Sequence, residues 1–332
     1  MSLLEIKDLY IDYKTDDADV HAVNGLDLTL EKGECLGLVG ETGAGKTSTA
    51  LGILRLLPTP QGKYLGGSIL FNDIPLLEIG DAAMRDIRGK CISMIFQDPM
   101  TSLNPVYTIG NQIVEVILLH TKKTKQEAWA RAKELLELVG INEPERRLKQ
   151  YPHELSGGMR PRVMIAIALA CEPKLLIADE PTTALDVTIQ AQILELMNDL
   201  RHKLGMSIIM ITHDLGVVAQ MCEKIAVMYA GHIVEYGTTD EIFYNPQHEY
   251  TKGLINSIPK LNAEEKERLV PIEGQPVDLL NPPAGCPFAP RCKSCMKICL
   301  NKMPPKTELS DTHYTHCWLR QKEEFEKGGK AE

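Results

Sequence analysis

The spacing of apolar and polar residues divides this chain of 332 residues into stretches of different periodicity. Apolar residues alternate with polar ones over Leu4–Tyr13 and His21–Leu30, which predicts two half-buried strands joined by an acidic turn. The apolar run at 34–39 predicts a short strand buried on both faces, and a helix over roughly 46–57 follows it. The chain therefore begins with an antiparallel pair and continues with a strand–helix unit.

Helices are predicted to interrupt this pattern in the middle of the chain. Two further strands are expected at 68–73 and 91–98, after which the hydrophobic period lengthens. Ile109–His120 and Gln126–Val139 carry apolar residues at helical spacing, and Gly140 suits the end of the second helix. These helices indicate a subdomain inserted between two sets of strands.

Strand–helix alternation returns after the insertion. The apolar run KLLIAD at 174–179, a helix over Thr188–Leu204 and a strand over Met206–Thr212 follow the order that is typical of a parallel sheet. A hairpin is predicted over 224–237, with its turn at Ala230-Gly231. The chain is therefore expected to be an α/β protein with an added antiparallel layer.

One octapeptide in the first strand–helix unit indicates a phosphate site. Residues 40–47 read GETGAGKT, which fits G-x-x-x-x-G-K-[ST] between a strand and a helix. The glycines let backbone N–H groups face a phosphate, Lys46 would reach the β- and γ-phosphates, and Thr47 would bind Mg²⁺. A chance glycine-rich turn is the alternative. The predicted nucleotide-binding residues are Gly40, Glu41, Thr42, Gly43, Ala44, Gly45, Lys46, Thr47 and Ser48.

Two acidic residues follow the apolar run at 174–179. Asp179, at the carboxyl end of the predicted strand, suits the Mg²⁺ shell, and Glu180 suits the polarisation of an attacking water. Adjacent acids after a buried strand are unfavourable unless an ion or water satisfies them. A solvated turn is the alternative, although the apolar residues before the acids favour burial.

A second glycine-rich segment, LSGGM at 155–159, precedes a further apolar-periodic stretch. Ser156 is expected to cap a helix whose first N–H groups Gly157 and Gly158 leave uncovered, which makes a second anion site. Two such sites serve one nucleotide if a second subunit supplies one of them. Pro161 would then lie in the second helical turn, where a proline costs about 3 kcal/mol.

Together these motifs resemble the ATP-binding cassette (ABC) family, in which LSGGQ is matched here by LSGGM. The resemblance extends to Gln97 in FQDP, to Ala184-Leu185-Asp186 and to His213 in MITHD. It implies that Gln97 senses Mg²⁺ and the attacking water, that His213 contacts the γ-phosphate, and that Asp186 couples two sites across a dimer.

The resemblance also supplies the other site residues. Tyr13 matches the aromatic residue that stacks on adenine, although Tyr10, three residues earlier, could be the core residue instead. The Mg²⁺ ligands would be Thr47, Gln97 and Asp179. The segment that would act on the nucleotide of the partner cassette comprises Leu155, Ser156, Gly157, Gly158 and Met159.

Charge and hydropathy narrow the class of partner. The formal net charge of −9 and the pI of about 5.6 disfavour nucleic acid as the main ligand. No apolar run reaches the roughly 18 residues of a membrane span, and the N-terminus lacks a secretory pattern. We therefore expect a cytosolic protein that reaches the cytoplasmic face of the membrane through partner proteins.

Nine cysteines fall into two groups. Four are scattered in apolar context and are expected to be reduced core residues. The other five crowd the last fifty residues, among Pro and Gly: Cys286, Cys292, Cys295, Cys299 and Cys317. A disulfide framework is unusual in the cytosol, so binding of a metal centre by thiolates is the favoured interpretation.

The text GCPFAPRC and the later cysteines resemble the C-terminal motif of oligopeptide and dipeptide importer ATPases. This resemblance implies a [4Fe–4S] cluster bound by Cys286, Cys292, Cys299 and Cys317, with Cys295 as a bystander. Tetrahedral zinc is the alternative, because Cys292-x2-Cys295 has zinc-knuckle spacing and two histidines lie near Cys317. We expect ATP binding to survive replacement of these cysteines, because Lys46 and its loop would lie in a separate core.

The sequence thus predicts a P-loop NTPase of the ABC-cassette fold with an antiparallel β subdomain. Residues 1–255 would form the nucleotide-binding domain, with helices inserted at about 100–165, and 256–332 a small metal-binding extension beginning near Pro259. The resemblance implies an ATPase that drives peptide import with two permeases, a second cassette and an extracytoplasmic binding protein. A soluble ABC-type ATPase and an ATP-regulated iron–sulfur sensor are the alternatives, and the cargo is left open between dipeptide, oligopeptide and nickel.

Overall fold

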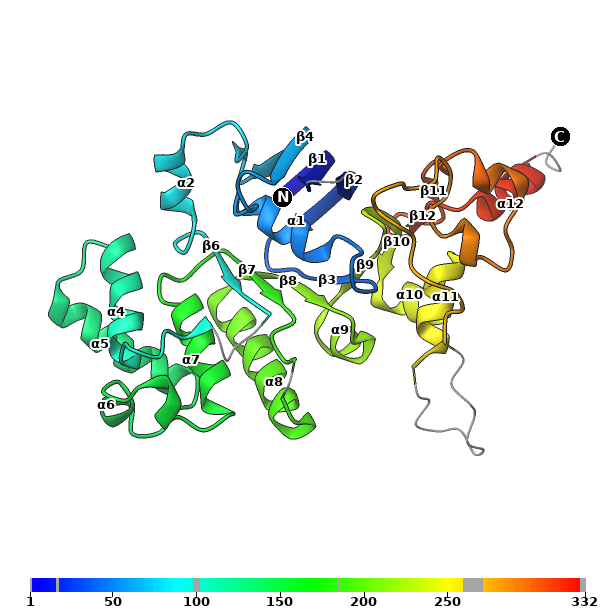
Figure 1. The fold of residues 1–332 in the computed structure, drawn as a ribbon. Helices are drawn as coiled ribbons and strands as arrows, with labels where there is room; N and C mark the ends of the chain where they lie inside the picture. Colours follow the sequence, from blue (N-terminus) through cyan, green and yellow to red (C-terminus); the bar gives the residue numbers. More distant parts are fainter. Residues whose placement is uncertain (1, 16–17, 98–101, 184, 259–270, 329–332) are drawn as a thin grey trace, which may run out of the picture. The chain divides into compact units, whose positions relative to one another are not determined.

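The phosphate-binding segment and the acidic segment belong to different compact units of the chain, each of which is built from three stretches of sequence. Unit 1 comprises Met1–Leu3, Leu30–Cys35 and Phe71–Ile211, and unit 2 comprises Leu4–Thr29, Leu36–Leu70 and Thr212–Glu332. The computed structural model describes all residues except 1, 16–17, 98–101, 184, 259–270 and 329–332 (Figure 1). The boundary expected at Pro259 lies outside the described residues.

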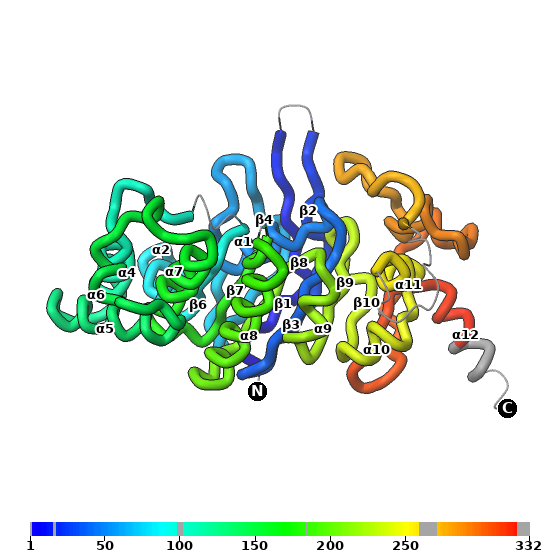
Figure 2. The backbone as a smooth tube through the Cα atoms, turned by 90° about the horizontal axis from the view of Figure 1, so that it is seen from below, coloured from blue at the N-terminus to red at the C-terminus, as the bar shows by residue number. Residues whose placement is uncertain are grey.

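Unit 2 contains the antiparallel layer. Strands β1 (Ser2–Lys14) and β2 (Asp19–Glu31) run side by side (Figure 2), and β4 (Gly62–Phe71) pairs with the other edge of β1. Leu4, Ile6 and Leu9 of β1 are buried, whereas residues between them face outward. The alternation in the sequence predicted these two strands, and the structure confirms them.

A second group of paired strands in unit 2 carries the phosphate loop. Its strand β3 (Cys35–Val39) runs parallel to β9 (Lys224–Tyr229), and β9 forms an antiparallel hairpin with β10 (His232–Thr238). The hairpin turn lies at Ala230 and Gly231, whose φ angles of 49° and 81° are both in the left-handed region. The predicted hairpin and its turn are therefore confirmed.

The C-terminal tail extends this same group of strands. Strand β12 (Tyr314–Thr315) pairs with β10, and β11 (Thr307–Glu308) pairs with β12. Buried Glu235 of β10 accepts hydrogen bonds from the backbone N–H groups of Gln247 and His248, and lies 2.8 Å from His313 Nε2 of the tail. Other elements of unit 2 are α1 (Lys46–Ile53), α9 (Leu215–Met221), α10 (Thr239–Tyr244), α11 (Glu249–Asn256), the 3₁₀ turns η2 (Ala289–Arg291) and η3 (Lys297–Leu300), and α12 (Trp318–Gly328).

Unit 1 contains three paired parallel strands that carry the acidic segment. Strand β7 (Leu175–Asp179) lies between β6 (Ile92–Ile95) and β8 (Ser207–Thr212), and all three strands run parallel. Every residue of β7 and β8 is buried, as expected for strands covered on both faces. Helix α8 (Val187–Leu204) connects β7 to β8. The remaining short elements of unit 1 are β5 (Ile74–Pro75), α2 (Asp81–Ile87) and η1 (Pro152–Glu154).

Four helices form the other part of unit 1 and lie beside one another in Figure 1. The predicted helices are confirmed as α4 (Ile109–His120) and α5 (Lys125–Leu138), and α6 (Pro144–Arg147) and α7 (Met159–Ala168) complete the group. Thr124 and Glu127 form a capping box at the start of α5. Trp129 of α5 lies so close to Gly110 of α4 that a Cβ there would be 2.3 Å from its ring.

The start of α7 differs from the prediction. Its N-cap is Gly158 rather than Ser156, whose carbonyl instead accepts from the N–H groups of Met159 and Arg160. Pro161 is therefore the third helical residue and lies in the first turn, where an N–H has no partner within the helix. The predicted cost of a proline in the second turn is wrong for this reason.

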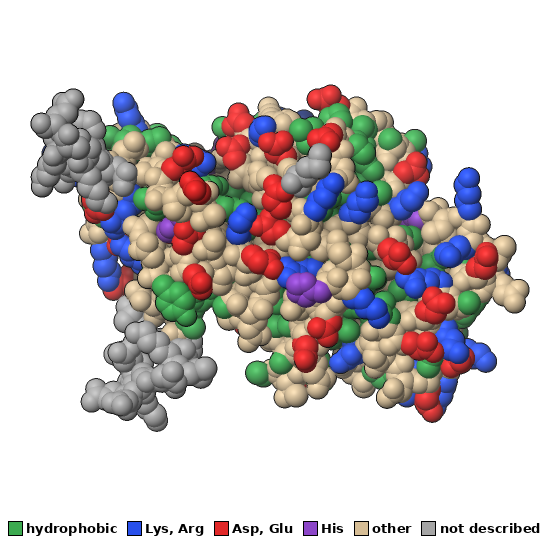
Figure 3. Space-filling model, turned by 180° about the vertical axis from the view of Figure 1, so that it is seen from behind, with side chains coloured by type: hydrophobic (Ala, Val, Ile, Leu, Met, Phe, Trp, Pro, Cys, Tyr) green, Lys and Arg blue, Asp and Glu red, His purple; other side chains and the backbone are tan. Residues whose placement is uncertain are grey.

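In the part of the chain that the structure describes, no helix is long and apolar enough to cross a membrane. Acidic and basic side chains are interspersed over the face shown in Figure 3.

Candidate functional site

The phosphate loop has a backbone that glycine alone suits. Gly43 and Gly45 have φ angles of 82° and 100°, and Gly45 is the residue that caps α1. A Cβ on Gly45 would lie 2.3 Å from the carbonyl oxygen of Ala22, whereas a Cβ on Gly43 would meet nothing within 4 Å. Gly45 is thus required by close packing, and Gly43 by conformation.

Lys46, the first residue of α1, is folded back over this loop. Its side chain is buried, and Nζ donates to the carbonyl oxygens of Gly40 at 2.7 Å and Glu41 at 3.0 Å. The loop thereby holds an ammonium group at the N-terminus of a helix, where backbone N–H groups also favour an anion. Of the other predicted residues, Thr42 and Thr47 are exposed, Ala44 is buried, and Ser48 is half-buried.

Two residues that sequence reasoning missed contact Glu41. The Arg291 guanidinium of the tail pairs with the Glu41 carboxylate at 2.6 Å, and the Glu41 N–H donates to the Tyr250 hydroxyl at 2.8 Å. The only local signal was a charged residue within GCPFAPRC. The expectation that the phosphate loop and the tail lie in separate cores is therefore wrong.

The acidic segment is preorganised by hydrogen bonds within unit 1. Glu180 Oε2 accepts from Gln97 Nε2 and from Thr183 Oγ1, both at 3.0 Å, and the Glu180 N–H donates to Ile211 O. Glu180 has a φ of 48°, an uncommon conformation for a residue with a side chain and one that clusters at functional sites. Asp179 is almost fully buried at the end of β7. The sequence did not predict the role of Thr183.

The glycine-rich segment at 155–159 packs against the helix that Asp186 caps. Asp186 Oδ1 accepts from the Ile189 N–H at the start of α8, and a Cβ on Gly158 would lie 3.0 Å from the Ile189 side chain. A larger residue at position 158 would therefore push on the first turn of α8. Ala184, which precedes this turn in the motif, lies outside the described residues.

His213 and Tyr13 belong to unit 2. His213 follows β8 and is exposed, and the next residue, Asp214, caps α9 through the Gly216 N–H. The half-buried Tyr13 ring lies at the end of β1 against Gly62, whose Cβ would be 3.2 Å from it. Tyr10 lies instead beside Gly25, and its pKa is raised by burial and by the neighbouring Asp8. The structure brings together Gln97 with Glu180 and Gly158 with the Asp186-capped helix.

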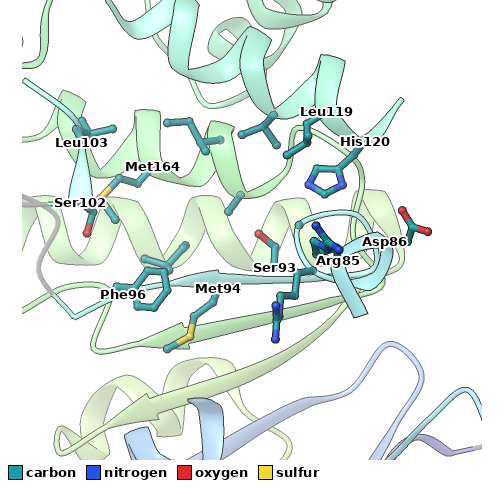
Figure 4. A pocket seen from close by; sticks show the side chains of 16 residues that line it. Arg85, Asp86, Ser93, Met94, Phe96, Ser102, Leu103, Leu119, His120 and Met164 are labelled. Carbon is teal, nitrogen blue, oxygen red and sulfur yellow. The ribbon is translucent and has the colours of Figure 1, made fainter. Parts of the chain in front are cut away.

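Unit 1 also has a cavity of about 490 Å³ beside Gln97. Residues of α2, β6, α4 and α7 line it together with residues between these elements, such as Leu103. Leu103, Met164 and Phe96 lie at one end and Arg85, Asp86 and His120 at the other (Figure 4). Burial lowers the pKa of His120, although Asp86 opposes this effect. The exposed Phe96 directly precedes Gln97, so this cavity adjoins the residue that contacts Glu180.

The tail cysteines converge on a second, smaller cavity of about 20 Å³ in unit 2. Cys286, Cys292, Cys299 and Cys317 line it together with Phe288 and Trp318, among others. Burial raises the pKa of Cys286 to about 12 and that of Cys292 to about 11, so both thiols are neutral near pH 7. Cys295 is exposed and does not line this cavity.

A lysine-bearing phosphate loop between a parallel strand and a helix defines a P-loop nucleoside triphosphatase. A family profile described as "ABC transporter" matches residues 23–183, and one described as "Oligopeptide/dipeptide transporter, C-terminal region" matches residues 234–299. The chain belongs to the ABC transporter ATP-binding proteins, in the group that includes the oligopeptide and dipeptide transport ATPases. It is an ATPase of the ABC type, and its cassette fold is the one predicted.

The relatives cover nearly the whole chain. The oligopeptide transport ATP-binding protein OppD of Bacillus subtilis (strain 168) is 57% identical over 96% of this chain and 88% of its own length. The dipeptide transport ATP-binding protein DppD of the same organism is 52% identical over 96% of this chain and 95% of its own. Among solved structures, a dimeric post-hydrolysis state of the ATP-binding cassette MJ0796, bound to ADP and phosphate, has a TM-score of 0.63. It is 26% identical over 71% of this chain and 98% of that one.

Proposed function

We propose that this chain is the ATP-hydrolysing subunit of an importer for dipeptides or oligopeptides and that it acts at the cytoplasmic face of the membrane. The observation that carries the hydrolytic part is the hydrogen bond between Gln97 and Glu180. The peptide cargo is supported by relatives that are named for oligopeptide and dipeptide transport and are 50% or more identical.

Each site residue has a role in this proposal. Thr47, Gln97 and Asp179 would hold Mg²⁺, which would neutralise charge on the β- and γ-phosphates. Glu180 takes a proton from the attacking water, held in place by Gln97 and Thr183. Lys46 binds the phosphates, Tyr13 stacks on adenine, and His213 contacts the γ-phosphate.

A second cassette completes the site. The segment at 155–159 acts on the nucleotide of the partner cassette, and Asp186 couples the two sites. Asp186 caps α8, and Gly158 packs against the first turn of the same helix. A movement of the segment at 155–159 therefore also moves Asp186. ATP therefore closes the two cassettes together, and hydrolysis lets them separate.

The cavity beside Gln97 is the proposed contact for a membrane permease. Its exposed apolar side chains, Phe96 and Leu119, suit a short apolar segment of a partner protein. Phe96 directly precedes Gln97, which contacts Glu180. A permease segment bound at Phe96 would therefore be linked to Glu180 through Gln97. The complete importer then comprises two permeases, two cassettes and an extracytoplasmic peptide-binding protein.

Glu180→Gln tests this function. In proteoliposomes that contain the permeases, the second cassette and peptide-binding protein, the variant should retain ATP binding. It should lower hydrolysis at this site and peptide uptake at least tenfold, because the water loses its base. The chain alone should hydrolyse ATP more slowly than the complex.

Glu195→Gln is the matched control, because Glu195 is an exposed residue of α8, and it should hydrolyse ATP like the wild type. Near-wild-type hydrolysis by Glu180→Gln at a site known to turn over would remove Glu180 from the mechanism. Peptide uptake that does not depend on ATP would refute the transport role.

We also propose that the four cysteines of the tail cavity bind a [4Fe–4S] cluster. Four thiols on one cavity match the ligand number of such a cluster. Burial raises the pKa of Cys286, Cys292 and Cys317 and so disfavours their thiolate forms, and iron would supply the compensating charge. When bound, the cluster would cross-link four points of a tail that has few apolar residues.

Zinc is the less favoured occupant. Neither metal has a preformed site, since the described residues contain no group of three or more His, Cys, Asp or Glu side chains arranged to hold a metal ion. His313 and His316 do not line the cavity, and His313 contacts buried Glu235 instead.

Anaerobic purification tests the cluster. The chain should be brown and should contain iron and acid-labile sulfide, because four thiolates are the usual cluster ligands. Cys286→Ser should lose colour, iron and sulfide, whereas the matched variant Cys295→Ser should keep them. Colourless protein that contains one equivalent of zinc would show that the cysteines bind zinc and not a cluster.

A further inference from the structure

The tail residue Arg291 lies directly against the phosphate loop within unit 2. Its Nη1 and Nη2 atoms donate to Glu41 Oε2 and Oε1 at 2.6 and 3.1 Å, which makes a two-pronged ion pair. The Arg291 side chain is only 5% exposed and that of Glu41 27% exposed. The pair is therefore largely shielded from water, unlike the surface ion pairs that contribute little.

Every N–H of the Arg291 guanidinium has an acceptor. Besides the two bonds to Glu41, Nε donates to Glu273 O at 3.0 Å, Nη2 to Ile272 O at 3.2 Å and Nη1 to the Tyr229 hydroxyl at 3.3 Å. A guanidinium has five donors in fixed directions, and all five are used. Lysine, with a single ammonium group, cannot reproduce this arrangement.

Glu41 in turn is fixed at three groups. Its carboxylate is held by Arg291, its N–H donates to the Tyr250 hydroxyl, and its carbonyl accepts from Lys46 Nζ at 3.0 Å. Tyr250 is fully buried and packs on Tyr229, with ring centroids 4.6 Å apart. Glu41, whose carbonyl accepts a hydrogen bond from Lys46, is thus anchored to the buried Tyr250 and to Arg291 of the tail.

The tail segment before Arg291 makes a second contact with the phosphate loop. Pro276, Val277 and Leu279 line a small cavity with residues 41–44 of the loop. Leu279 O accepts from the N–H of His21 on β2 at 3.1 Å. The segment before Arg291 therefore runs along the outside of the phosphate loop and is tied to β2.

We propose that Arg291 is a positioning residue for ATP, so that the tail is part of the nucleotide site. By holding Glu41, Arg291 keeps the loop and the Glu41 carbonyl in the arrangement that places Lys46 for the phosphates. This inference rests on the proposed nucleotide site but not on any group bound by the cysteines. Arg291 acts through Glu41, whose carboxylate it contacts directly.

The test is a double-mutant cycle on nucleotide affinity. Arg291→Gln should weaken binding of a fluorescent ATP analogue about tenfold, within the usual range of coupling between sites. Glu41→Gln should weaken it similarly, and the double variant no further, because the pair acts as one unit. In the assembled transporter, Arg291→Gln should raise KM for ATP with kcat within about twofold of wild type. Arg291→Lys should recover only part of the affinity.

Lys293→Gln is the matched control, since Lys293 pairs with Glu273 on the exposed surface of the same segment. It should bind the analogue like the wild type. Wild-type affinity in Arg291→Gln, or losses in the two single variants that multiply in the double variant, would overturn the proposal. Lys46→Ala separates the two hypotheses: if it binds ATP normally, the nucleotide site itself is wrongly placed.

Discussion

Pro161 occupies the first turn of α7 with its ring buried. It lines a small apolar cavity with Ile95, Pro181 and Ile193, and its missing N–H would have had no helical partner. The ring contributes packing and also restricts the unfolded chain. Both effects stabilise the folded protein at this position.

Pro161→Ala should therefore lower the free energy of unfolding by about 1–2 kcal/mol, through lost apolar burial and a freer unfolded chain. Denaturant titration of the purified chain measures this change. A proline in the second turn would give the opposite sign, since its removal would stabilise the helix by about 3 kcal/mol. A more stable variant would contradict the observed helix start.

Single residues could be predicted well where the residues that they contact are close to them in the sequence, and poorly where those residues are far away. The phosphate loop is contiguous, so Lys46 and Thr47 could be identified from eight letters. Glu180 and Gln97 were named separately, but their contact joins residues 83 positions apart and depends on the order of the strands. Glu41 and Arg291 are 250 positions apart, and no local pattern relates them.

At the scale of elements, Glu241 ties the tail to α10. Its carboxylate accepts from the N–H and hydroxyl of Thr238, which forms the capping box of α10, and from the hydroxyls of Ser310 and Thr312 in the tail. Burial raises the pKa of Glu241, but these hydrogen bonds outweigh it and lower the pKa to about 2. The charged form is therefore favoured in the folded state.

The sign of the pH effect follows from this lowered pKa. Glu241 stabilises the fold above its ordinary pKa of 4.5, and this contribution is lost as pH falls towards 2. Glu241→Gln should be less stable than the wild type at pH 7, and the difference should shrink steadily below pH 4.5. Denaturant unfolding of both proteins across this range measures it. A constant difference at all pH values would show that Glu241 acts by shape and not by charge.

Elements with a strong period were predicted well, and those that depend on distant partners were not. Helix α4 has the predicted bounds, because its apolar face and Thr108 cap are local features. The tail strands β11 and β12 have two residues each and no usable period. They exist because β10 offers an edge for pairing, which the sequence of the tail does not record.

For the whole molecule, the sequence predicted the class of protein. Composition and motifs indicated an ABC ATPase with an appended tail. In the structure, each compact unit draws on three separate stretches of the chain. The tail packs within unit 2, where His313 contacts buried Glu235 and Arg291 contacts Glu41. Such packing follows from the fold, and no stretch of sequence specifies it alone.

The ion pair between positions 41 and 291 bears on how such chains diverge. Losing one partner leaves the other as a shielded, unpaired charge, which is strongly unfavourable. Descendants of one ancestor are therefore expected to keep or change both residues together. A chimera that joins this cassette to a foreign tail inherits half of the pair, so tails are not interchangeable parts even between close relatives.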